Sequence, residues 1–116
     1  MRFDPSLHLP LTPAMFQVLV ALADGEKHGY AIIKEVARRT DGKVHLRPGT
    51  LYTAIKRFVV DGLIVESATR PDPALDDERR RYYRLTDRGR AVAEAEADRL
   101  AETLAQARAK LALRKA

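Results

Sequence analysis

Hydrophobic residues recur every three or four positions between Arg47 and Gly62, which is the period of an amphipathic α-helix. Proline suits the first turn of a helix and glycine suits its end, so Pro48 and Gly62 are the predicted limits of this element. Its apolar face is expected to anchor a small core and contains Leu51, Ile55, Phe58 and Val59.

The opposite face of the same predicted helix is polar and basic. Thr53, Lys56 and Arg57 lie on it, and Arg47 comes just ahead of the helix. Residues 43–60 contain no carboxylate. Arg, Lys and Thr side chains reach phosphates and base edges in the major groove of DNA. The pattern therefore predicts a helix that lies in this groove.

Two helices are expected ahead of it. Thr12 and Pro13 are typical of a helix start, as N-cap and first helical residue, and Gly25 ends this first helix. The first helix is apolar almost all the way round, which indicates that it buries one side in its own core and another against something else. A second helix is expected over Gly29–Arg39, and residues 44–46 are a candidate short strand.

Residues 63–69 and 80–85 are rich in β-branched and aromatic side chains and predict the two strands of a hairpin with a long tip. Thr86 caps a last helix that runs to near the C-terminus. Small residues and leucines repeat along it with spacings of four and three, which is typical of a helix-packing seam. The alternative is a helix that packs on its own domain. The seam residues are Ala93, Ala97, Leu100, Leu104, Ala107 and Leu111.

Three helices followed by a two-stranded hairpin form a winged helix-turn-helix, in which the hairpin flanks the third helix as a wing. We therefore expect a mainly α protein with a small β-hairpin. It divides into an extended N-terminal arm (residues 1–11), a winged helix-turn-helix DNA-binding domain (12–86) and a long C-terminal dimerisation helix (87–116).

Composition narrows the classes of function. The chain has 116 residues, enough for one domain, and its formal net charge of +5 favours polyanionic partners. It has no cysteine, no apolar run near the roughly 20 residues that span a bilayer, and no apolar signal region behind its N-terminus. We expect a cytoplasmic protein with no membrane partner.

No catalytic constellation stands out. His8, His28 and His45 share no ligand-like spacing, so neither a metal nor another cofactor is expected. The only serines, Ser6 and Ser67, lie in no nucleophile motif, and no glycine-rich phosphate loop follows a predicted strand. We therefore do not expect an enzyme.

Several short motifs resemble those of the PadR-type transcriptional regulators. They occur in the family's order over about residues 11–90, and their number makes the resemblance specific. The short, single-helix C-terminus looks like the compact branch of that family. The matching segments are Leu11-Thr-Pro13, Leu22-Ala-Asp-Gly25, His28-Gly-Tyr-Ala-Ile32, Pro48-Gly-Thr-Leu-Tyr52, Asp61-Gly-Leu-Ile64 and Arg81-Tyr-Tyr-Arg-Leu-Thr86 with Gly89.

The resemblance implies a bacterial winged-helix protein, usually a repressor, that binds an inverted-repeat operator in double-stranded DNA as a homodimer. The C-terminal helix would pack against the partner's N-terminal helix. This assigns to the dimer interface the seam residues given above together with Phe16, Leu19 and Val20.

The family's DNA contacts fall on the third helix and the wing. One departure is the acidic tip of the predicted wing, Asp76, Asp77 and Glu78, whose carboxylates would repel phosphates. The predicted wing contact therefore moves to the basic run beside the tip. The DNA-binding residues are Arg47, Thr50, Tyr52, Thr53, Lys56, Arg57, Arg79, Arg80 and Arg81.

These residues have different expected roles. The planar fork of Arg57 can bind guanine O6 and N7, whereas Lys56 is expected to contact phosphate. Thr53 and Thr50 can bond phosphate or touch a thymine methyl; for Thr50 the alternative is ordinary chemistry of a helix N-terminus. The Tyr52 ring can pack on the core while its hydroxyl bonds a phosphate.

For the basic side chains, the alternatives are a solvated helix face and a strand edge that is charged against aggregation. Winged helices also serve as protein-interaction modules, which need not keep a basic third helix. A small-molecule effector near the dimer interface is a further prediction, because the apolar first helix lies beside an alanine-rich long helix. The sequence specifies neither its chemistry nor the operator.

Overall fold

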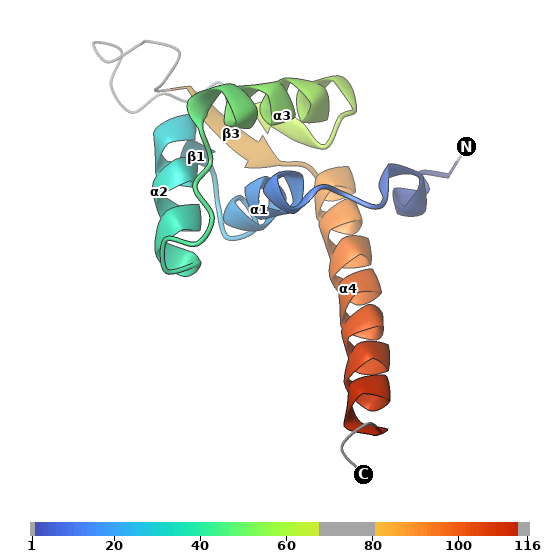
Figure 1. Ribbon diagram of the computed structural model, residues 1–116. Helices are drawn as coiled ribbons and strands as arrows, with labels where there is room; N and C mark the ends of the chain where they lie inside the picture. Colours follow the sequence, from blue (N-terminus) through green and yellow to red (C-terminus); the bar gives the residue numbers. More distant parts are fainter. Residues whose placement is uncertain (1, 68–80, 114–116) are drawn as a thin grey trace.

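The computed structural model describes residues 2–67 and 81–113. In order, the elements are η1 (Pro5–His8), α1 (Pro13–Ala21), β1 (Lys27–His28), α2 (Gly29–Arg39), α3 (Pro48–Val60), β2 (Ile64–Glu66), β3 (Tyr82–Leu85) and α4 (Asp87–Leu113). Helices α1 to α3 and the small sheet form one body, from which α4 extends as a rod (Figure 1). The predicted fold class is confirmed: the chain is mainly helical, with a small sheet and a long last helix.

Local signals explain where the helices begin and end. The Thr12 hydroxyl accepts a hydrogen bond from the Met15 amide at 3.1 Å, and the Thr86 hydroxyl accepts one from the Gly89 amide at 3.0 Å. Both threonines therefore cap helices, as predicted. Helix α3 begins at Pro48 and ends before Gly62, whose φ of 76° is costly for residues with a side chain.

The sheet has three antiparallel strands in the order β1-β3-β2, not the two that the sequence predicted. Ile64 pairs with Leu85 across β2 and β3, and His28 pairs with Tyr82 across β1 and β3. The predicted strand at 44–46 does not form. In its place the edge of β3 is covered by the two-residue β1, which is too short to show an alternating pattern.

The sequence predicted an extended N-terminal arm, but the arm contains the short helix η1 and is therefore not extended throughout. Asp4 starts this turn by accepting hydrogen bonds from the Ser6 amide at 3.0 Å and from the Ser6 hydroxyl at 2.7 Å. Proline at the first position fixes the helical φ. The arm contacts α4, and the Arg88 guanidinium lies 5.0 Å from the centre of the Phe3 ring.

One hydrophobic core joins all the helices except η1. Val59, predicted on the apolar face of α3, is 43% exposed, and Ala54 is buried in its place. The buried hydrophobic residues are Val18, Leu19, Ala21, Leu22, Ile32, Val36, Leu46, Leu51, Ala54, Ile55, Phe58, Leu63, Ile64, Tyr83 and Val92.

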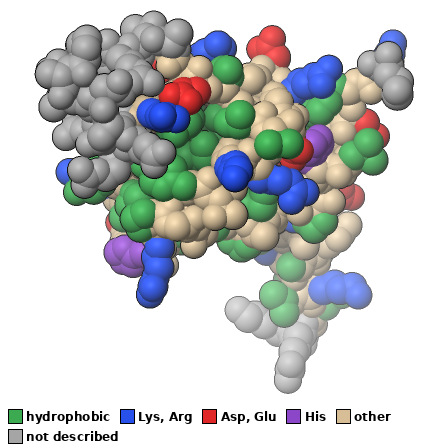
Figure 2. Space-filling view, turned by 90° about the horizontal axis from the view of Figure 1, so that it is seen from above, with side chains coloured by type: hydrophobic (Ala, Val, Ile, Leu, Met, Phe, Trp, Pro, Cys, Tyr) green, Lys and Arg blue, Asp and Glu red, His purple; other side chains and the backbone are tan. Residues whose placement is uncertain are grey.

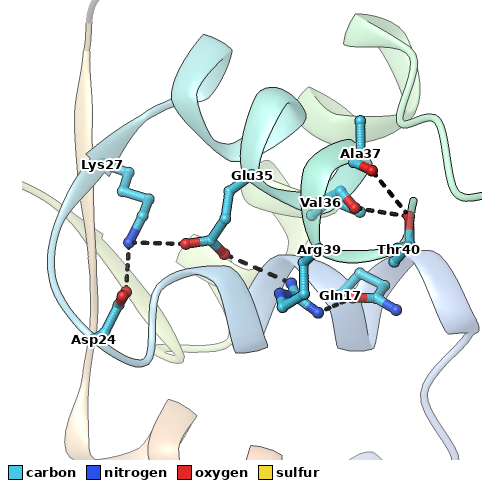
Figure 3. Close-up of polar contacts among 8 residues, drawn as sticks. All are labelled: Gln17, Asp24, Lys27, Glu35, Val36, Ala37, Arg39 and Thr40. Carbon is cyan, nitrogen blue, oxygen red and sulfur yellow. Dashed lines mark hydrogen bonds and ion pairs between the residues drawn. The ribbon is translucent and has the colours of Figure 1, made fainter. Parts of the chain in front are cut away.

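A polar network on the side of the core fixes α2 against α1 and the turn that follows it (Figure 3). The Lys27 ammonium lies 2.5 Å from the Asp24 carboxylate and 3.5 Å from the Glu35 carboxylate. The Arg39 guanidinium lies 3.6 Å from Glu35 and donates to the Gln17 amide oxygen at 2.7 Å. These contacts hold the two helices that support α3.

Helix α4 contacts the core only with its first turns. Its last buried residue is Glu96, and every residue from 97 to 113 is exposed. The radius of gyration is accordingly 16.4 Å, against about 13 Å for a compact domain of this length. None of the helices in the described part of the chain is both long and apolar enough to cross a membrane.

Candidate nucleic-acid interface

The outer face of α3 gathers the predicted helix contacts other than Tyr52 on one surface. Leu51, Ile55 and Phe58 are buried beneath it and fix the rotation of the helix about its axis. Seen from the α3 side, the molecule shows Lys and Arg side chains spread among hydrophobic ones (Figure 2). The exposed polar and basic side chains on α3 and just ahead of it are those of Arg47, Thr50, Thr53, Lys56 and Arg57.

The start of α1 borders this face, which the sequence did not predict. A depression of about 650 Å³ lies between the two helices, with Thr12 and Met15 on one side and Thr50, Thr53 and Arg57 on the other. Hydroxyl groups and a guanidinium thus line a shared hollow at the surface. Only the packing of α1 on α3, which are far apart in sequence, brings these groups together.

Arg57 is restrained by a neighbour one turn along. Its Nε lies 3.3 Å from Oδ2 of Asp61, and the Arg57 side chain is 71% exposed. An ion pair this exposed contributes little to stability because water screens it. The guanidinium can therefore exchange Asp61 for another acceptor, such as a guanine edge, at small energetic cost.

Tyr52 packs across the start of α2. A methyl group built on Gly29 would collide with the Tyr52 hydroxyl and ring, so any larger residue here would force the Tyr52 side chain to move. The Tyr52 side chain is half-buried and packs against the core. The core role predicted for this ring is thus present, and its phosphate contact stays a prediction.

The described part of the wing has one inner and one outer face. Tyr83 is buried and Leu85 half-buried, whereas Arg84 between them is exposed. Arg81 is on the inner side, with its Nε 3.6 Å from the Glu66 carboxylate. The remaining wing residues of the prediction, Arg79 and Arg80, and the acidic tip at 76–78 lie outside the described residues.

A second depression, of about 470 Å³, joins α3 to the wing. Lys56 and Val60 of α3 line one side, and Glu66 of β2 and Arg81, just ahead of β3, line the other. Lys56 and Arg81, predicted separately as helix and wing contacts, therefore border the same hollow. Across the described residues, no group of three or more His, Cys, Asp or Glu side chains is placed to hold a metal ion.

The predicted dimer residues fall into three groups. Leu19 is fully buried in its own core and offers no surface to a partner, which corrects its assignment to an interface. Phe16, Val20 and Ala93 are half-buried. The other five are exposed along α4: Ala97, Leu100, Leu104, Ala107 and Leu111.

Comparison with known proteins agrees with this geometry. The family model described as "Transcriptional regulator PadR-like family" matches residues 18–95. A transcriptional regulator of Mycobacterium tuberculosis is 37% identical over 75 residues, which are 65% of this chain and 64% of that protein. An uncharacterised protein of Lysinibacillus sphaericus is 30% identical over 64% of this chain and 65% of its own length. The chain thus spans slightly less than two thirds of these relatives.

Solved structures share the fold. A PadR family transcription regulator from Clostridium difficile superposes with a TM-score of 0.68 at 26% identity, covering 84% of this chain and 96% of that one. A transcriptional regulator from Clostridium thermocellum gives 0.66 at 27% identity, over 77% and 83%. Bacillus subtilis PadR, solved in complex with operator DNA, gives 0.61 at 23% identity, over 78% and 48%, and this likeness shows the fold alone.

Proposed function

The chain belongs to the PadR-like family of transcriptional regulators, which are not enzymes, and we propose that it acts in the cytoplasm as a homodimeric repressor that binds an inverted-repeat operator. Each α3 lies in a major groove, and the wing contacts the adjacent backbone. Arg57 reads a base edge, and Lys56 and Arg81 contact phosphates. Because phosphate contacts release counterions, binding weakens steeply as salt is raised.

The observation that carries this proposal is the chemistry of α3. Its outer face presents cations and hydroxyls without a carboxylate until Asp61, while its inner face is buried in the core. The same face borders two surface depressions, one toward α1 and one toward the wing. A basic helix that stands between two surface depressions has the dimensions to enter a major groove.

Dimerisation is supported by the outer half of α4. Leu100, Leu104 and Leu111 are 41%, 50% and 68% exposed in the single chain. Exposed leucines in a heptad-like row gain stability when a second helix covers them. A two-fold dimer places its two α3 helices symmetrically, which is why the operator is an inverted repeat. The predicted release by a small-molecule effector stays a prediction.

Selection of bound sequences from a random duplex pool tests the proposal. We expect enriched sequences with two inverted half-sites whose centres lie about one helical turn, or a multiple of it, apart. Enrichment of single, asymmetric sites would reject the homodimeric mode. No enrichment, with retention on duplex DNA that does not depend on salt, would favour the alternative, a protein-interaction module.

A further inference from the structure

Glu96 stands out because it is a charge in the interior. Within residues 2–67 and 81–113 it is the only buried charged side chain, with 1% exposed. Its Oε2 accepts a hydrogen bond from the Leu11 amide at 2.7 Å, and its Oε1 accepts one from Arg99 Nε at 2.5 Å. A buried carboxylate is tolerated when its oxygens are bonded in this way. Both bonds therefore define one position for the side chain.

The place of Glu96 in the fold is equally specific. It is the last buried residue of α4, and every residue from 97 to 113 beyond it on the helix is exposed. Leu11, its partner, immediately precedes Thr12, the cap of α1, and α1 packs on α3. The carboxylate thus ties the base of the projecting helix to the helix that supports the predicted reading helix.

Two contacts nearer the start of α4 fix the helix at its other end. The Thr86 hydroxyl donates to the Gly62 carbonyl at 2.7 Å, and Arg90 donates to the Ala23 carbonyl at 2.8 Å. A methyl group on Gly89 would collide with the Leu63 carbonyl, so the first turn is held close to the body. With this end held, the hydrogen bond between Glu96 and Leu11 is the polar contact farther along the helix that ties α4 to the arm, beyond the buried Val92.

We propose that Glu96 is a positioning residue that sets the angle between α4 and the winged domain, and through it the separation of the two α3 helices in the homodimer. The inference rests on the proposed function, because the separation has meaning only if two copies pair through α4. Glu96 itself contacts neither DNA nor the partner in this scheme. It acts by holding the joint between the two surfaces that do.

A small change of angle at Glu96 moves the far end of α4 by several ångström. Residues 97–113 form about 25 Å of helix at about 1.5 Å per residue. A change of about 10° at Glu96 would displace the far end by about 4 Å. That exceeds the rise of about 3.4 Å per nucleotide of one strand along the axis of duplex DNA. A loose joint would therefore let each α3 meet half-sites of more than one separation.

A distance measurement between protomers tests this without DNA. The chain has no cysteine, so V60C on α3, where Val60 is 78% exposed, gives one spin label per protomer. Pulsed electron paramagnetic resonance then reports the distance between the two labels. We expect a single narrow distribution, which Glu96→Gln broadens or shifts by several ångström, about the size of the displacement above. Glu94→Gln, an exposed acid on the same helix, is the matched control and should leave it unchanged.

An unchanged distribution in a folded, dimeric Glu96→Gln protein would overturn the proposal, and so would a monomeric wild-type chain. If Glu96→Gln fails to fold, Arg99→Gln takes its place, because it removes one of the two bonds at an exposed position. It should broaden the distribution in the same way, and an unchanged distribution would count equally against the proposal.

DNA binding supplies the second readout. Affinity is measured for a series of operators whose two inverted half-sites are separated by spacers that increase by one base pair. Wild type should bind one spacer length most tightly. Glu96→Gln should reduce that preference several-fold while affinity for an isolated half-site stays unchanged. Equal loss on the half-site would mean that Glu96 acts on α3 itself, against the proposal. Wild type that binds no DNA would reject the proposed function, whereas the label distances would still decide the role of Glu96.

Discussion

The outer face of α3 and the outer half of α4 are both exposed to water, but the first carries charged side chains and the second carries apolar ones. Arg57 and Lys56 on α3 are charged and well hydrated, and their exposure costs the single chain nothing. Leu100 and Leu111 on α4 are apolar, and each exposed Å² costs about 25 cal/mol relative to burial. The α3 surface is complete in one chain, whereas the exposed leucines of α4 are the surface that the proposed homodimer would cover.

The largest effect should come from breaking the α4 surface. Leu104→Asp places a carboxylate in the seam, so the dimer should dissociate. Affinity for a full operator should then fall about 100-fold or more, because both half-sites no longer bind together. Sedimentation equilibrium and gel-shift titration measure the two effects. Ala109→Asp, on the opposite side of the same helix, is the control; equal loss in both variants would contradict a role for the seam.

The next effect concerns the α3 surface alone. Arg57→Ala should cost roughly 1–3 kcal/mol of operator binding and blur the preference at one base pair, with no change in dimerisation. Lys56→Ala should instead weaken binding to all sequences and reduce the slope of log affinity against log salt concentration by about one for each half-site. Titrations against base-substituted operators at several salt concentrations separate the two roles. Identical profiles for the two variants would show that Arg57 does not read a base.

A third change tests what holds α3 in place. Gly29→Ala puts a methyl group against the Tyr52 ring, and overpacking of this kind typically costs about 1–3 kcal/mol of stability. Tyr52→Leu removes the ring, so the double variant should regain part of the loss. A double-mutant cycle of denaturant unfolding measures the coupling. Additive losses would mean that the two residues do not clash.

The sequence predicts α3 well because its signals are local. Pro48 and Gly62 mark its limits, and the spacing of Leu51, Ile55 and Phe58 defines its inner face. It does not decide between Val59 and Ala54 at the edge of that face, because the direction from which α1 and α2 approach settles which side chain is covered. For the same reason it does not show that Leu19 is enclosed in its own core.

Other features leave no local pattern at all. Strand β1 has two residues and forms only because β3 presents a free edge. Glu96 and Leu11 are 85 positions apart, and in the sequence Glu96 is one of several acids on a helix of mixed charge. The nearest sequence signal is its place between Ala93 and Ala97 on the seam. Long-range contacts of this kind need the folded chain to be recognised.

The smallest predicted effect is on the free energy of unfolding. It comes from Glu96, which links α4 to the winged domain, and it depends on pH. Arg99 foremost, together with the Leu11 amide, holds the pKa of the Glu96 carboxyl below its ordinary value of 4.5, against the opposing effect of burial. A lowered pKa in the folded state means that the charged form stabilises the fold above pH 4.5 and that this contribution is lost as the pH falls through the folded value.

Glu96→Gln should therefore be less stable than wild type by about 1 kcal/mol near neutral pH, because it loses a charge-assisted hydrogen bond. The gap should narrow as the pH falls from 4.5 through the lower pKa of the folded state, because the carboxyl of folded wild type is then protonated as well. Asp4 and Asp24, whose pKa values are lowered by Ser6 and Lys27, titrate equally in both proteins and cancel in the difference. Denaturant unfolding at a series of pH values measures the gap; a gap that stays constant below pH 4.5 would show that the charge of Glu96 contributes nothing, and that the joint is held by shape alone.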